Sequence, residues 1–132
     1  MSAKSWADDF YPTEAKKLVS KSDIEVINHS IRKWEGALPK NLKLHNLAKP
    51  PIYFGTETCS LCQKYYANND EYAESLCDSC PIYNIRGAAC FEELDKEEIS
   101  PYHAYTINNN PSPMLKVLEA TRKYCIKAVV DG

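Results

Sequence analysis

The sequence contains no long hydrophobic run and very little glycine. No stretch approaches the ~18 apolar residues that a membrane-spanning helix needs, and the first residues, MSAKSWADDFYPTEAKK, lack the apolar core of a secretory signal. We therefore expect a cytoplasmic protein that does not enter a membrane. With 4 glycines in 132 residues, the chain also has no glycine-rich loop of the kind that cradles nucleotide phosphates.

Signatures of common enzymes are missing as well. The chain has no His-Glu-x-x-His of metalloproteases and no Gly-x-Ser-x-Gly of serine hydrolases. Zinc deaminases carry His-x-Glu upstream of Pro-Cys-x-x-Cys, and neither element occurs here. The sequence therefore predicts a protein that is not an enzyme.

Negative charge is concentrated in one part of the chain. The net charge is −2, but residues 50–110 carry ten acidic and three basic side chains, whereas residues 1–49 carry six acidic and nine basic ones. A zinc module that grips DNA needs a basic face to neutralise phosphates. Nucleic acid is therefore the less favoured partner for the acidic part.

Cysteines are the residues that point to chemistry. Cys59 and Cys62 form one Cys-x-x-Cys pair, Cys77 and Cys80 form another, and fourteen residues separate the two. In a reducing cytosol, closely spaced cysteines are metal ligands more often than disulfides, and these pairs have the spacing of a closed tetrathiolate zinc site. We expect Zn²⁺ bound by all four. A closed site leaves no position for substrate or water, so its role would be structural.

Other ligand sets and another metal stay open at this point. Cys90, which nine residues separate from Cys80, could replace Cys77 or Cys80, and His103 is a further candidate donor. Mononuclear iron of the rubredoxin type would also suit two pairs, although those knuckles carry glycines that this chain lacks. Cys125 lies in a predicted apolar helix stripe and is expected to be a core residue.

These features predict a small domain, 1–132, built on a zinc knuckle and mainly α with short β or irregular segments. Its expected parts are an extended N-terminal arm (1–12) whose aromatics pack onto the body, a helical part (13–49), an acidic zinc-knuckle part (50–110) and a C-terminal helix (111–132). Within the acidic part, Ile52–Phe54 is predicted to be a strand or an extended segment, and Ser100–Tyr105 an extended segment.

Two helices have clear signals. Ser22-Asp23-Ile24-Glu25 is a capping box, and the helix that it starts should end at Gly36 in the left-handed conformation. Its predicted buried face is Ile24, Ile27, Ile31 and Trp34, and its predicted solvent face is Arg32, Lys33 and Glu35.

The last helix should begin with Ser112 as the cap and Pro113 at its first position. Its predicted buried stripe is Met114, Val117, Leu118, Thr121, Tyr124, Cys125 and Ala128.

The cysteine pattern resembles one found in small uncharacterised zinc-knuckle proteins of bacteriophages and prophages. The residues that carry the resemblance are Cys59-x-x-Cys62-x-x-Tyr65, Cys77-x-x-Cys80-Pro81-Ile82, Gly87, Cys90, Ser100-Pro101-Tyr102 and the segment His29–Gly36. The resemblance implies a zinc-stabilised phage accessory protein in the host bacterial cytoplasm. The pattern includes Cys90 in addition to the two pairs. The resemblance implies neither a reaction nor a binding partner.

We expect a binding protein whose partner is a host or phage protein. A dense acidic run can engage a basic surface, including the nucleic-acid channel of another protein; its members are Glu92, Glu93, Asp95, Glu97 and Glu98. The sharpest form of this hypothesis is inhibition of a bacterial defence nuclease, an anti-defence role of the anti-CRISPR type. The alternatives are a merely solvated acidic face and a nucleic-acid-binding zinc regulator.

Overall fold

The protein is mainly helical, as expected. A computed structural model describes residues 3–18, 20–55, 58–64, 81–86 and 99–131. The elements in these ranges are α1 (Ala3–Phe10), the 3₁₀ turn η1 (Ala15–Leu18), α2 (Asp23–Glu35), α3 (Pro39–Leu44), α4 (Ser60–Cys62), α6 (Pro81–Arg86), α7 (Pro101–Asn108) and α8 (Ser112–Asp131). None of the described residues forms a strand, so of the two conformations predicted for Ile52–Phe54, a strand or an extended segment, the strand is wrong.

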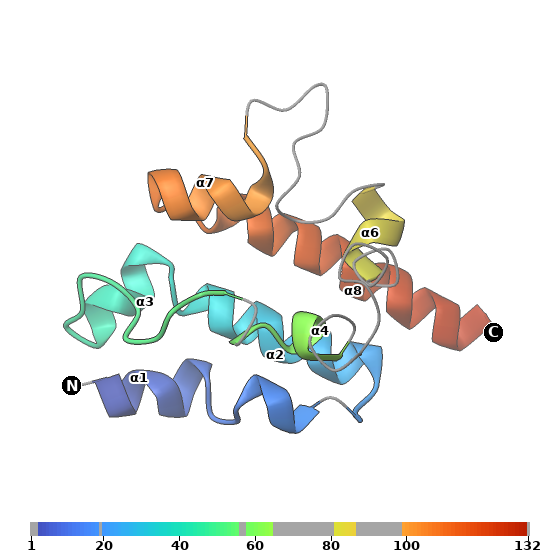
Figure 1. Cartoon of the computed structure of the whole chain (residues 1–132), viewed down its shortest axis with the longest axis horizontal. Coiled ribbons are helices and arrows are strands. Elements are labelled where there is room, and N and C mark those ends of the chain that lie inside the picture. Colours follow the sequence, from blue (N-terminus) through green and yellow to red (C-terminus); the bar gives the residue numbers. More distant parts are fainter. Residues whose placement is uncertain (1–2, 19, 56–57, 65–80, 87–98, 132) are drawn as a thin grey trace.

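Helices α2 and α8 lie side by side at the centre of the molecule (Figure 1), and they share the most extensive contact between two elements. From α2, Ile27, Ile31 and Trp34 are buried, as their spacing predicts. Met114 and Leu118 of α8 belong to the same hydrophobic cluster. The remaining elements pack around this pair, with α1 and α3 toward one end and α6 and α7 beside α8 (Figure 1).

The boundaries of α2 are set by a cap and by a close contact. The Ser22 hydroxyl accepts a hydrogen bond from the Glu25 backbone N–H at 3.2 Å, which confirms the predicted cap. Gly36 ends the helix but has φ −64°, so the predicted left-handed conformation is wrong. The reason for glycine is space: an added Cβ would lie 2.5 Å from Trp6 Cζ2 and 2.8 Å from Phe10.

Residues 3–10 form helix α1, so the prediction of an extended conformation for the N-terminal segment is wrong. The predicted packing of its aromatics is confirmed, because Trp6 is fully buried and Phe10 packs against the same core. These two residues are four apart, which places both rings on one side of a helix. The Trp6 indole also donates to the Gly36 carbonyl oxygen at 2.9 Å, joining α1 to the end of α2.

The segment predicted to be extended at Ser100–Tyr105 is instead the start of helix α7. Ser100 caps it by accepting from the His103 N–H at 3.2 Å, and Pro101 occupies its first turn. The helix turns the Tyr105 ring against Trp34 and Phe54, with centroids 4.9 and 5.2 Å apart. Because Phe54 packs within this aromatic cluster, the chain at this residue lies against the core.

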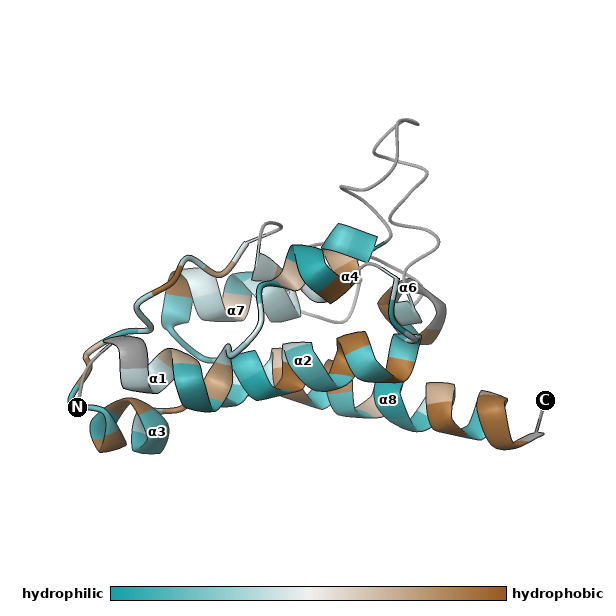
Figure 2. Ribbon diagram, turned by 90° about the horizontal axis from the view of Figure 1, so that it is seen from below, coloured by the Kyte–Doolittle hydropathy of each residue, from teal (hydrophilic) through white to brown (hydrophobic). Residues whose placement is uncertain are grey.

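The last turns of α8 extend beyond the end of α2 (Figure 2). Met114, Leu118, Thr121 and Cys125 are buried as predicted. Tyr124 and Ala128 are exposed, so the predicted stripe is wrong at its C-terminal end, where no described element covers it. The helix begins at Ser112, one residue earlier than predicted, and Asn110 Oδ1 accepts from the Ser112 N–H at 3.2 Å.

Helix α8 is the longest of the described helices, with 20 residues. Charged side chains recur along it, and neither α8 nor any other helix in the described ranges is long and apolar enough to cross a membrane.

Candidate metal centre

Cys59 and Cys62 form a compact turn at the start of α4. Cys59 has an extended backbone, and its sulfur accepts a hydrogen bond from the Cys62 backbone N–H at 3.4 Å. A hydrogen bond from a backbone N–H favours the thiolate form, which is the form that binds metals. The first predicted knuckle is therefore folded as a thiolate-stabilising turn.

Helix α2 holds this turn through two buried serines. Ser60 donates to the Val26 carbonyl oxygen at 2.6 Å, and the Ser30 and Ser60 hydroxyl oxygens lie 2.9 Å apart. Since Ser60 has one hydroxyl hydrogen and gives it to Val26, Ser30 is the donor in the second bond. Both serine side chains are almost completely buried, so these bonds fix the residue that follows Cys59 against the helix.

Lys33 holds the residue on the other side of Cys59. Its ammonium donates to the Thr58 carbonyl oxygen at 3.1 Å and approaches Thr58 Oγ1 at 3.4 Å. The prediction that Lys33 faces water is wrong, because the side chain is only 1% exposed. Val26, Ser30 and Lys33 are spaced by four and three residues, so they share one stripe of α2. That stripe contacts the residues on both sides of Cys59.

The Lys33 ammonium also lies over aromatic rings. Its nitrogen is 4.8 Å from the centroid of Phe54 and 5.6 Å from that of Trp34. Both distances are within the range of a cation–π interaction. The knuckle and the aromatic cluster are thus joined through one buried cation.

The thiol of Cys59 is strongly acidified. Its pKa is lowered from 9.0 to about 6, chiefly by a hydrogen bond from the Cys62 thiol, against the opposing effect of burial, and further by the positive charge of Lys33 and the backbone N–H groups of Cys62 and Leu61. Burial raises the pKa of the Cys125 thiol instead. The two cysteines are therefore expected to react very differently.

Alkylation of the metal-free protein tests this difference. The Cys59 thiolate should react with iodoacetamide in a pH profile whose midpoint lies near 6, whereas Cys125 should stay unreactive through neutral pH. Mass spectrometry of the alkylated peptides separates the two sites. A Cys59 midpoint near 9 would contradict the acidification.

Since the pKa of Cys59 is lower in the folded state than in the unfolded state, the Cys59 thiolate stabilises the metal-free fold fully above about pH 9, and this contribution falls as the pH drops toward 6.

The remaining predicted site residues lie outside the described part of the chain. These are the predicted ligands Cys77, Cys80 and Cys90 and the predicted partner-binding residues Glu92, Glu93, Asp95, Glu97 and Glu98. Within the described ranges no group of three or more His, Cys, Asp or Glu side chains could hold a metal ion. The structure thus shows the first pair of the predicted site.

Helix α6 begins at Pro81, the residue directly after Cys80, and proline suits the first position of a helix. Figures 1 and 2 both show α6 next to α4, and Ile82 of α6 and Leu61 of α4 belong to one hydrophobic cluster. His103, the other candidate donor, has its Nδ1 2.9 Å from the Ser100 hydroxyl at the start of α7.

Three residues missed in the sequence form a second polar cluster, at α1. His45 Nδ1 lies 3.0 Å from Ser5 Oγ, and His45 Nε2 lies 2.8 Å from Asp9 Oδ2. This order resembles a hydrolase triad, but the exposures are reversed, since the His45 side chain is 3% exposed and that of Asp9 is 55% exposed. A triad needs an accessible imidazole and a buried carboxylate. The cluster therefore fastens α1 to the residue that follows α3.

The sequence carried a weak signal for the stripe that holds the knuckle. Val26 is apolar and lies between Glu25 and Ile27, one position away from the predicted buried face of α2. Ser30 and Lys33 follow Val26 at helical spacing, but because their side chains are polar, the apolar periodicity does not reveal that they are buried.

Comparison with family profiles, with curated proteins and with solved structures finds no match for this chain.

Proposed function

We propose that this chain is a non-enzymatic binding protein braced by zinc, with Cys59, Cys62, Cys77 and Cys80 as the ligands. The observation that carries the proposal is the folded Cys59–Cys62 turn, whose first sulfur accepts a backbone N–H bond and lies in the field of a buried cation. Metal ligation requires deprotonated sulfur, so a thiol acidified to about 6 loses its proton to zinc at low cost. Cys90 is the alternative fourth ligand.

The residues present fit zinc better than a harder metal. Thiolate sulfur is a soft donor that suits Zn²⁺, whereas Mg²⁺ and Ca²⁺ take oxygen ligands. The second pair, Cys77 and Cys80, would supply two more sulfurs and close the site. When bound, zinc would cross-link the residues around α4 and α6 and leave no open position for a substrate. The centre therefore supports a surface and does not carry out a reaction.

The proposed partner is a host or phage protein with a basic surface, reached through the acidic run at residues 92–98. The carboxylates of this run stand in the part of the chain where acidic side chains outnumber basic ones ten to three. A surface with charge of one sign associates faster with a surface of the opposite charge. A nuclease channel that binds DNA has such a surface, which makes inhibition of a defence nuclease the specific form of this proposal and a phage or prophage its proposed origin.

Charge reversal tests the acidic surface. Changing Glu92, Glu93, Glu97 and Glu98 to Lys should abolish capture of the partner from a bacterial lysate, because attraction becomes repulsion. The matched control reverses two exposed acids elsewhere, Glu35 in α2 and Glu119 in α8, and should capture the partner as the parent does. Equal capture by the fourfold variant would contradict the acidic-surface proposal.

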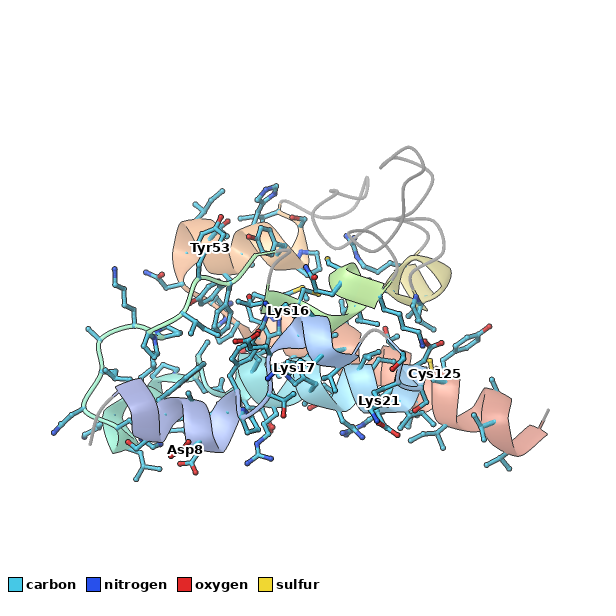
Figure 3. The ribbon with its side chains drawn as sticks, turned by 60° about the horizontal axis from the view of Figure 1, so that its bottom comes forward. Asp8, Lys16, Lys17, Lys21, Tyr53 and Cys125 are labelled. Atoms are coloured by element: carbon cyan, nitrogen blue, oxygen red, sulfur yellow. The ribbon has the colours of Figure 1, made fainter. Side chains whose placement is uncertain are left out.

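The second candidate is a nucleic-acid-binding zinc protein. The observation that favours it is a set of exposed lysines, Lys16, Lys17 and Lys21, along the segment that joins α1 to α2 (Figure 3). Lys16 is partly neutralised by Glu14, 3.5 Å away. Titration of labelled DNA at two salt concentrations separates the candidates, since phosphate contacts weaken steeply with salt.

A further inference from the structure

The last turns of α8 carry apolar side chains that the fold does not bury. Of the eight large apolar side chains exposed in the described part of the chain, four lie within residues 124–130. They are Tyr124 (50% exposed), Ile126 (44%), Val129 (69%) and Val130 (78%). Single exposed apolar residues are normal on a protein surface, whereas neighbouring ones mark a contact site. The helix extends beyond α2 here (Figure 2), so a partner can reach the patch.

Two lysines share one face of α8 with two of these apolar residues. Helix positions three and four apart are neighbours. Lys123 is therefore next to Ile126 and Lys127, and Val130 is next to the same two residues. All four side chains are exposed. The face combines aliphatic and positively charged groups, and we call these four residues the α8 end face.

The positive charge of the α8 end face is not neutralised by the described residues. Residues 122–131 contain three basic side chains and one acidic one, a balance of +2. No carboxylate of the described ranges forms an ion pair with either lysine of the face. Arg122, the third basic residue, donates instead to Asn28 Oδ1 of α2 at 3.0 Å. A molecule that covers this face must therefore bring negative charge as well as apolar surface.

Size and charge together define the partner. The helix from 122 to 130 is about 13 Å long, which suits a few turns of a partner segment and is too small for a standard protein–protein interface. Contact with the same face of a second copy would bring lysine toward lysine, which is unfavourable. We propose that the α8 end face binds a short amphipathic segment of another protein, in which apolar side chains are interspersed with Asp or Glu. This surface is additional to the acidic run, and the inference does not rest on the zinc centre.

Two labelled synthetic helical peptides test the proposal with the full-length protein by fluorescence anisotropy. Both carry leucine at positions i, i+3, i+4 and i+7, and the flanking positions hold glutamate in one and lysine in the other. The glutamate peptide should bind at least about tenfold more tightly, because opposite charges then flank the apolar contact. Lys123→Glu with Lys127→Glu should reverse this preference. Ile126→Ser with Val130→Ser should weaken binding of the glutamate peptide by about tenfold or more.

The matched control is Lys17→Glu with Lys21→Glu, which changes the charge equally in the exposed segment between α1 and α2 and should keep the preference of the parent. Equal binding of both peptides by the parent, or an unchanged preference in the Lys123/Lys127 variant, would overturn the proposal. Self-association that the serine variant abolishes, measured by sedimentation, would overturn it in favour of a second copy. Flotation with phosphatidylserine vesicles that this variant abolishes, in a parent that binds neither peptide, would assign the face to a lipid surface instead.

Discussion

Cys59→Ser is expected to abolish zinc binding and to remove most of the stability of the zinc-bound protein. Structural zinc sites of this type contribute on the order of 10 kcal/mol of binding free energy to folding. The hydroxyl of serine does not ionise at neutral pH, so the turn that Ser60 and Thr58 hold against α2 would present no charge to the metal. Thermal unfolding of the reconstituted protein, with its zinc content, measures both effects.

The control for this variant is Cys125→Ser. Cys125 is buried in α8 and its thiol is not acidified, so this change should keep one zinc per chain and lower stability only modestly. Addition of a strong chelator to the parent should reproduce the unfolding of Cys59→Ser. Full zinc content and an unchanged melting temperature in Cys59→Ser would contradict the assignment of this ligand.

Trp34→Ala is expected to cost about 3–5 kcal/mol of unfolding free energy. Trp34 is 2% exposed, and its ring meets Phe54 and Tyr105 edge-on with both centroids 4.9 Å away. Its removal leaves a cavity, deletes these ring contacts and removes one of the two aromatic rings near the Lys33 ammonium. Urea unfolding measures the change.

Tyr53→Ala is the matched control, because Tyr53 is an aromatic residue of the same region that is 78% exposed (Figure 3). It should change the free energy of unfolding by no more than about 0.5 kcal/mol. Equal losses for Tyr53→Ala and Trp34→Ala would contradict the described packing of the aromatic cluster.

The parts of the fold that could be predicted are those with local signals. The cap at Ser22 and the spacing of Ile27, Ile31 and Trp34 specify α2 through contacts within a few residues. Helix α7 carries the same Ser-Pro start as α8, Ser100-Pro101 against Ser112-Pro113, but only at the later one is a helix predicted from the sequence. The aromatic residues that follow Pro101 have high strand propensity, and packing against Trp34 outweighs it.

The candidate site likewise has one part that could be predicted from local sequence and one part that could not. The Cys59–Cys62 turn follows from its own sequence and is found as a thiolate-stabilising turn. Lys33 could not be placed, because its partner Thr58 lies 25 residues away in the chain and a lysine in a helix faces water by default. Gly36 has a similar explanation, since Trp6 and Phe10 approach it from 30 and 26 residues earlier. Long-range contacts decide these positions.

The central claim is that zinc is held by four cysteine sulfurs that include Cys59 and Cys62. X-ray absorption at the zinc edge, with elemental analysis of the full-length protein purified without added metal, tests it most directly. The account predicts one zinc per chain, surrounded by four sulfur atoms at about 2.3 Å. A metal-free chain with a Cys59–Cys62 disulfide, or a zinc ion bound by nitrogen and oxygen, would contradict it.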